Sequence, residues 1–85
     1  MSEILIVAGS ITNATRLEKR LLSYGDKRTR VINTPDQISK GGCSYSVVAS
    51  FSSEQYVRSG LRGINIKGIY LIDNSMGMRY YHDIS

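Results

Sequence analysis

The chain has 85 residues, of which 41% are apolar, and its formal net charge is +4. This length suffices for one small domain over residues 1–85, and the longest apolar run, residues 4–8, is far below the roughly 20 residues of a membrane helix. One cysteine and one histidine argue against an internal disulfide framework, a Cys-X-X-Cys redox pair and a zinc site within one chain, so we expect no metal.

The same composition indicates where the protein works. We expect no secretory signal and no membrane association, because no basic stretch followed by an apolar run opens the chain. A lone cysteine suits a reducing compartment, so we expect a cytoplasmic protein.

A buried strand and an amphipathic helix are predicted first. Residues 4–8 form a short β-branched run closed by Gly9 and Ser10, which is typical of a buried strand. Ser10 or Thr12 can then cap a helix that ends at Gly25. The apolar residues expected to share the buried side of this helix are Ile11, Ala14, Leu17, Leu21, Leu22 and Tyr24.

Two further strands are predicted on either side of a loop that contains two glycines. Residues 28–34 indicate a second strand, which Pro35 stops. Residues 36–42 have turn chemistry throughout, and residues 43–51 alternate as a third strand. The residues expected on one face of that strand are Cys43, Tyr45, Val47, Ala49 and Phe51.

A second helix, a fourth strand and a tail complete the predicted elements. Residues 52–55, Ser-Ser-Glu-Gln, fit a capping box with Ser52 as N-cap, and Gly63 is expected to end the helix. Residues 67–74 indicate a fourth strand, and residues 75–85 form either an added strand or a packed tail. 

The order β-α-β-β-α-β predicts an α+β, ferredoxin-like sandwich. Its antiparallel sheet would have the order 4-1-3-2, with both helices on one face. This fold carries many functions, so function has to be argued from particular residues. No iron–sulfur cluster or other cofactor is expected, because one cysteine cannot hold a cluster.

The net charge lies in one region. Residues 16–30 hold six basic and two acidic residues, and the rest of the chain sums to zero. Such a region is either a solvated helix face or a nucleic-acid contact. Nucleic-acid-binding modules add stacking aromatics, whereas the first strand offers aliphatic side chains. Nucleic-acid binding is therefore the weakest of the hypotheses considered.

Cys43 is the sharpest candidate for chemistry. It follows Lys40, Gly41 and Gly42, and a nearby lysine with accessible backbone N–H groups favours a thiolate and a bound anion. A lone cysteine is also commonly a small buried apolar residue, and the local sequence by itself favours that role. 

The expected topology adds residues from other elements. Strand one ends, helix one begins and strand three begins at the same end of a 4-1-3-2 sheet, and the N-terminus of a helix favours anions. We therefore expect an electropositive, anion-binding pocket at that end. Its residues would be Gly9, Ser10, Thr12, Ser39, Lys40, Gly41, Gly42, Cys43 and Ser44.

Several short motifs resemble the selenium/sulfur (Se/S) carrier-protein-like family of small bacterial domains. They are Thr-Asn-Ala at 12–14, Glu-Lys at 18–19 with Leu22, Thr-Pro at 34–35, Ile-Ser at 38–39, Cys43, and Lys-Gly-Ile-Tyr at 67–70. The resemblance spans residues 4–72 and implies that Cys43 holds sulfur or selenium as a persulfide or selenosulfide. It implies a carrier, rather than an enzyme, that serves a donor and an acceptor protein. One departure bears on the loop conformation: Ser44 stands where the family commonly has glycine.

Three functions are therefore weighed from the sequence. The first is the sulfur or selenium carrier. The second is a non-enzymatic module that binds a small anion or regulates through the glycine loop, with Cys43 incidental. The third is nucleic-acid binding through residues 16–30. If two chains form a homodimer, we expect contact through the fourth strand or the tail, because Arg28 and Arg30 discourage pairing at the second strand.

Overall fold

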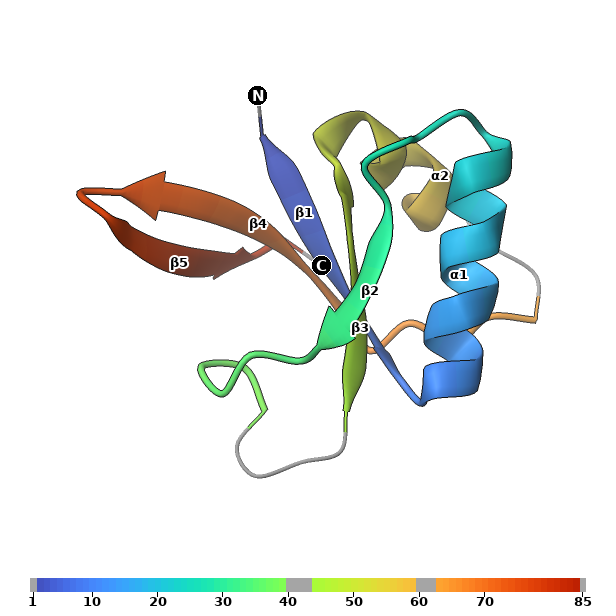
Figure 1. Ribbon diagram of the computed structural model, residues 1–85, viewed down its shortest axis with the longest axis horizontal. Helices are drawn as coiled ribbons and strands as arrows, with labels where there is room; N and C mark the ends of the chain where they lie inside the picture. The colour runs from blue at the N-terminus through green and yellow to red at the C-terminus, as the bar shows by residue number, and fades with distance from the viewer. Residues whose placement is uncertain (1, 40–43, 60–62, 85) are drawn as a thin grey trace.

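The computed structural model describes residues 2–39, 44–59 and 63–84. These residues form an α+β fold with one antiparallel sheet and two helices (Figure 1). The elements in chain order are β1 (Glu3–Gly9), α1 (Ile11–Ser23), β2 (Arg30–Asn33), β3 (Tyr45–Ser50), the 3₁₀ turn η1 (Phe51–Ser53), α2 (Glu54–Arg58), β4 (Gly68–Ser75) and β5 (Met78–Asp83).

The sheet has five strands in the order β2-β3-β1-β4-β5, so the predicted four-stranded sheet was wrong as a complete description. The four predicted strands keep the neighbours expected of them, and β5 is added beside β4. The reason is a two-residue turn, in which Met76 has φ 52° and Gly77 has φ 75°. Positive φ at both central residues matches the right-handed twist of a hairpin, so the predicted tail folds back as a strand.

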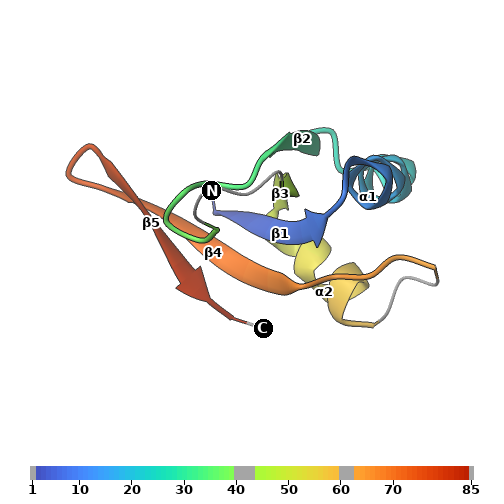
Figure 2. The ribbon, with the colours of Figure 1, turned by 90° about the horizontal axis from the view of Figure 1, so that it is seen from below.

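Both helices pack on one face of the sheet, as expected. Ala14, Leu17 and Leu21 of α1 and Val57 of α2 join one buried cluster with inward residues of β1 and β3. The β4–β5 hairpin extends away from the helices (Figures 1 and 2). The helices therefore cover the centre of the sheet and the start of β4, where Ile69 joins the same cluster, and leave the far end of the hairpin uncovered (Figure 1).

The helix-free face has a small core of its own. Leu5, Val7, Val48 and Ile72 are buried there. Ile38, from the turn over residues 35–39, packs against them, as do Tyr70 and Tyr81 from the hairpin. A loop and two tyrosines thus cover this face in place of a helix.

Helix α1 begins and ends as the sequence indicates. The Ser10 Oγ accepts a hydrogen bond from the Asn13 backbone N at 3.1 Å, which makes Ser10 the N-cap and leaves Thr12 inside the helix. At the other end, Gly25 has φ +97° and donates to Leu22 O, while Asp26 N donates to Leu21 O. These two bonds are a Schellman motif, which only glycine enters without strain.

The buried side of α1 is narrower than predicted. Ala14, Leu17 and Leu21 are fully buried, whereas Ile11 is 49% exposed and Leu22 45% exposed. Tyr24 is also exposed and stacks on Tyr56 instead. The helix contacts the sheet along a single stripe, so residues at the margins of the predicted apolar arc stay in solvent.

The junction after β3 differs from the predicted capping box. Ser52 is not the N-cap of a long helix: Phe51 leaves the strand, is 46% exposed and starts η1, and the helical residues 54–58 follow. The Ser53 hydroxyl donates to Asp26 and makes no cap hydrogen bond. Ser53, the residue after the predicted N-cap, is thus tied through Asp26 to the turn between α1 and β2.

Candidate functional site

One end of the sheet is where β1 ends and β3 begins, and the residues that follow Cys43 in the sequence lie there. Gly9, the last residue of β1, pairs with Tyr45, the first residue of β3. Ser10 follows Gly9, and Ser44 precedes Tyr45, so helix α1 and strand β3 begin beside each other at the lower end of the sheet in Figure 1. We call this region, which contains Gly9, Ser10, Thr34, Ser44 and Lys67, the loop end.

The central residues of the predicted pocket lie outside the described residues. These are Lys40, Gly41, Gly42 and Cys43. The described residues that flank them are Ser39, whose N donates to Pro35 O at 3.0 Å, and Ser44, which is half-buried. The anion-binding pocket itself therefore stays a prediction.

The remaining predicted residues are not all brought to one place. The turn that holds Ser39 packs through Ile38 on the helix-free face, whereas Ser10 starts a helix on the opposite face. Thr12 lies on the outer side of α1, where it lines a separate cavity of about 340 Å³. Gly9 and Ser44 thus lie at the loop end, with Ser10 and Ser39 approaching from opposite faces.

A chain of hydroxyl groups supports Ser44, and sequence reasoning missed it. Thr34 N donates to Ser44 O at 2.9 Å, and Thr34 Oγ1 donates to Ser44 Oγ at 2.9 Å. Thr34 Oγ1 also lies 2.6 Å from the fully buried Ser46 Oγ. Since Thr34 has one hydroxyl hydrogen and gives it to Ser44, Ser46 must donate to Thr34. The hydroxyl hydrogen of Ser44 therefore remains available to a group beyond the strand.

Lys67 places a positive charge at the loop end. A Cβ on Gly9 would lie 3.0 Å from the Lys67 Cε and 3.2 Å from its Nζ, so the amine lies directly over the glycine. Lys67 N also donates to Val7 O at 2.8 Å, which fixes the backbone there. The first turn of α1 contains no acidic residue. The ammonium and the helix N-terminus therefore add to one another electrostatically.

A signal for Lys67 existed in the sequence. A lysine that directly precedes a strand antiparallel to β1 has to reach the end of β1, because antiparallel neighbours start where the other finishes. The hydroxyl chain had no such signal, because Thr34 and Ser46 are brought together only by the pairing of β2 with β3.

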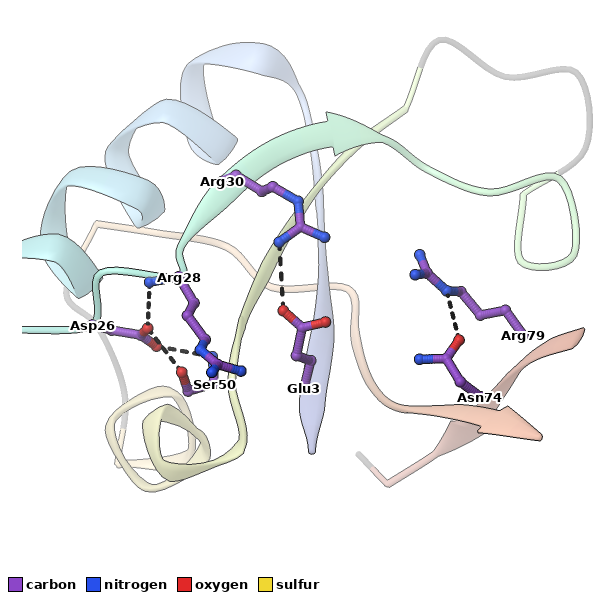
Figure 3. Close-up of polar contacts among 7 residues, drawn as sticks. All are labelled: Glu3, Asp26, Arg28, Arg30, Ser50, Asn74 and Arg79. Carbon is purple, nitrogen blue, oxygen red and sulfur yellow. Dashed lines mark hydrogen bonds and ion pairs between the residues drawn. The ribbon is translucent and has the colours of Figure 1, made fainter. Parts of the chain in front are cut away.

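The opposite end of the sheet is held by Asp26 (Figure 3). Its carboxylate accepts hydrogen bonds from Ser50 N at 2.9 Å, Ser50 Oγ at 3.0 Å, Arg28 N at 3.1 Å and the Ser53 hydroxyl. Burial raises the pKa of Asp26, but these hydrogen bonds outweigh burial and hold the pKa below its ordinary value of 3.8. The group is ionised at neutral pH and ties the α1–β2 turn to the end of β3.

Four of the six basic residues of the 16–30 region fall into two groups. Arg30 forms an ion pair with Glu3 at 3.4 Å (Figure 3). Arg16, Lys19 and Arg20 instead line one cavity of about 510 Å³ beside Gly63 and Ile64. Within residues 2–39, 44–59 and 63–84, no carboxylate lies within ion-pair distance of those three cations. 

The described residues contain neither a membrane-spanning helix nor a cluster of metal-binding side chains. No helix there is long and apolar enough to cross a membrane. No group of three or more His, Cys, Asp or Glu side chains in that part of the chain is arranged to hold a metal ion.

Comparison with known proteins supplies a family. The family model described as "Putative Se/S carrier protein-like" matches residues 3–71. No curated protein and no solved structure matches the chain. The matched range runs from β1 into β4, so it contains both helices and the loop end, while β5 lies beyond it. Because the match covers most of the chain, the protein belongs to the Se/S carrier protein-like family.

Proposed function

We propose that this protein carries sulfur or selenium on Cys43, as a persulfide or selenosulfide, between a donor protein and an acceptor protein. The observation that carries the proposal is the family match over residues 3–71, within which Cys43 is the only cysteine of the sequence. A carrier needs one thiol and no second cysteine, since a second thiol would attack the persulfide, form a disulfide and release the sulfur.

The loading step balances without an added oxidant. The Cys43 thiolate attacks the outer sulfur of a donor persulfide, a new S–S bond forms on Cys43, and the S–S bond of the donor breaks. The donor leaves as a thiolate, and the electron pair of the broken bond stays with it. Unloading repeats the exchange, with an acceptor nucleophile attacking the outer sulfur and Cys43 leaving as the thiolate.

The charges at the loop end support this chemistry. Both the attacking thiolate and the loaded persulfide are anions, and cations or helix N-termini stabilise such groups. The Lys67 amine over Gly9 and the uncompensated start of α1 supply positive charge near the point where β3 begins. The Ser44 hydroxyl, next to Cys43 in sequence, retains a hydrogen that it can donate to an anion.

Intact-mass analysis tests the proposal. The protein is incubated with a cysteine desulfurase and cysteine, and we expect a gain of one sulfur atom that a thiol reductant removes. The Cys43→Ser variant should gain nothing. If the wild-type protein gains no sulfur while the desulfurase releases sulfide normally, the carrier function is wrong.

The same variant separates the carrier from an anion-binding module. If the loop end serves only to bind a small anion, Cys43→Ser should bind inorganic sulfate or phosphate as the wild type does, and no sulfur should be gained by either protein. Loss of the positive charge in Lys67→Met would then weaken the anion affinity.

The cavity lined by Arg16, Lys19 and Arg20 favours nucleic-acid binding as a further candidate. Phosphate contacts make affinity fall steeply with salt concentration. Binding to a generic duplex that does not change between low and moderate salt would remove this candidate.

A further inference from the structure

Strand β5 forms one edge of the sheet. It pairs with β4 on one side from Ser75↔Met78 to Tyr70↔Asp83, and no described strand lies on its other side. Two of its large side chains are exposed, with Met78 at 60% and Tyr80 at 45%. An open edge of this kind is a template for pairing with another strand.

The hairpin decides which backbone groups face outward. Ser75 and Met78 flank the two-residue turn and therefore form a hydrogen-bonded pair. Hydrogen-bonded pairs recur at every second residue, and Ile84 N donates to Ile69 O at 2.9 Å, in agreement with this spacing. Met78, Tyr80 and His82 thus direct their backbone groups to β4, whereas Arg79 and Tyr81 direct theirs to the open edge.

The sequence of this edge is complementary to itself in one antiparallel register. If two copies pair about Tyr81, the central tyrosine faces its own counterpart, and the residues on either side match in chemistry. Arg79 then lies opposite the partner's Asp83, Tyr80 opposite the partner's His82, and Met78 opposite the partner's Ile84. Directly opposed residues share a face and interact, and opposite charges or apolar pairs there are favourable.

The surroundings of the edge suit a second strand. Tyr81 packs on the buried cluster of the helix-free face, so its position is fixed before association. Beside it lies a cavity of about 480 Å³ between the 35–39 turn and β5, lined by Ile38, Tyr70 and Tyr81 among others. Arg79 Nε donates to Asn74 Oδ1 at 3.2 Å, which holds the arginine over the hairpin (Figure 3). Asp83 makes a contact within its own chain, to which the partner's Arg79 would add.

We propose that two copies of this protein pair through β5, antiparallel and centred on Tyr81, to give one continuous ten-stranded sheet. The other edge strand, β2, carries Arg30 and is less suited to this, because like charges would meet there. The proposal goes beyond the carrier function, since β5 lies outside the family match and pairing uses no residue of the loop end.

Charge exchange at the two ends of β5 tests the register. In the Arg79→Asp variant, acidic side chains stand at positions 79 and 83, and in the Asp83→Arg variant basic ones do. In a dimer of either variant, like charges would lie opposite each other at two places. We therefore expect its dissociation constant to be about tenfold higher than that of the wild type. An equimolar mixture of the two variants restores both opposite-charge pairs, and its dimer should approach the wild-type dissociation constant.

Sedimentation equilibrium of the full chain, from micromolar to millimolar concentrations, provides the measurement. The mixture also guards against misfolding, because an unfolded variant could not be rescued by its counterpart. The control is Lys27→Asp, which makes the same change in net charge as Arg79→Asp but lies far from β5. It should leave the dissociation constant unchanged. The proposal would be overturned if the wild-type chain remained monomeric at all concentrations. It would also be overturned if both variants and their mixture had the dissociation constant of the wild type.

Discussion

Thr34 and Ser44 are joined by two hydrogen bonds, one between their backbones and one between their hydroxyls, each of 2.9 Å. They close the base of the connection between β2 and β3, in which Cys43 lies. The pairing also gives a structural reason for Ser44, which occupies a position where the family commonly has glycine. A glycine would keep the backbone bond and lose the hydroxyl bond.

Removing the Thr34 hydroxyl should destabilise the protein more than removing that of Ser44. Thr34→Val leaves the buried Ser46 hydroxyl without its partner, and an unsatisfied buried group costs about 1–3 kcal/mol. Ser44→Gly removes only one of the two side-chain hydrogen bonds of Thr34 Oγ1, because the bond to Ser46 remains. Its cost should therefore be about 1 kcal/mol or less. Urea denaturation of the two variants checks the order, and the reverse order would contradict the hydroxyl chain.

Gly9→Ala should destabilise the protein by about 1–2 kcal/mol, because a side chain at φ +89° is strained. The added Cβ would meet the far end of the Lys67 side chain, which can move aside at little cost. Gly25→Ala is the matched control, since Gly25 has φ +97° and nothing within 4 Å of an added Cβ. Equal free energies of unfolding for the two variants are expected, and a much larger loss for Gly9→Ala would mean that Lys67 is held rigidly.

Asp26 should make stability depend on pH in the acid range. Its folded pKa is lowered below the ordinary 3.8, so the group contributes stability above that value and loses it as the pH falls through the folded pKa. Asp26→Asn should cost roughly 2 kcal/mol at neutral pH, since hydrogen bonds to a carboxylate are stronger than those to an amide. 

The difference between wild type and Asp26→Asn should therefore shrink as the pH is lowered. Urea denaturation of both proteins at neutral pH and at several values below 4 measures this. A difference that stays constant with pH would show that the charge of Asp26 contributes nothing.

The stacked pair Tyr24–Tyr56 should couple α1 to α2. The ring centroids are 4.5 Å apart with 29° between the planes, and such pairs contribute about 0.5–1.5 kcal/mol. A double-mutant cycle with Tyr24→Ala and Tyr56→Ala should give a coupling energy in that range. Additive effects of the two substitutions on the free energy of unfolding would show that the two rings do not stabilise each other.

Local patterns in the sequence determined much of the framework. Three local patterns each predict an element that is present: the apolar run at 4–8, the serine and glycine at the two ends of α1, and the alternation over residues 43–51. The antiparallel neighbours of β1 also follow from the order of elements. These predictions work because capping, burial and alternation depend on residues a few positions apart.

Contacts between residues distant in sequence decided the rest. Asp26 binds the Ser53 hydroxyl at the start of α2, and the sequence near Ser53 contains no sign of that carboxylate. Thr34, Ser44 and Ser46 form one hydroxyl chain only because β2 pairs with β3. The order of the elements predicts that Lys67 lies at the loop end, whereas the contact of its side chain with Gly9 is seen only in the folded chain. The tail becomes β5 because the turn at Met76 and Gly77 brings it to an edge of β4 that offers unpaired backbone groups, and only the assembled sheet provides that edge.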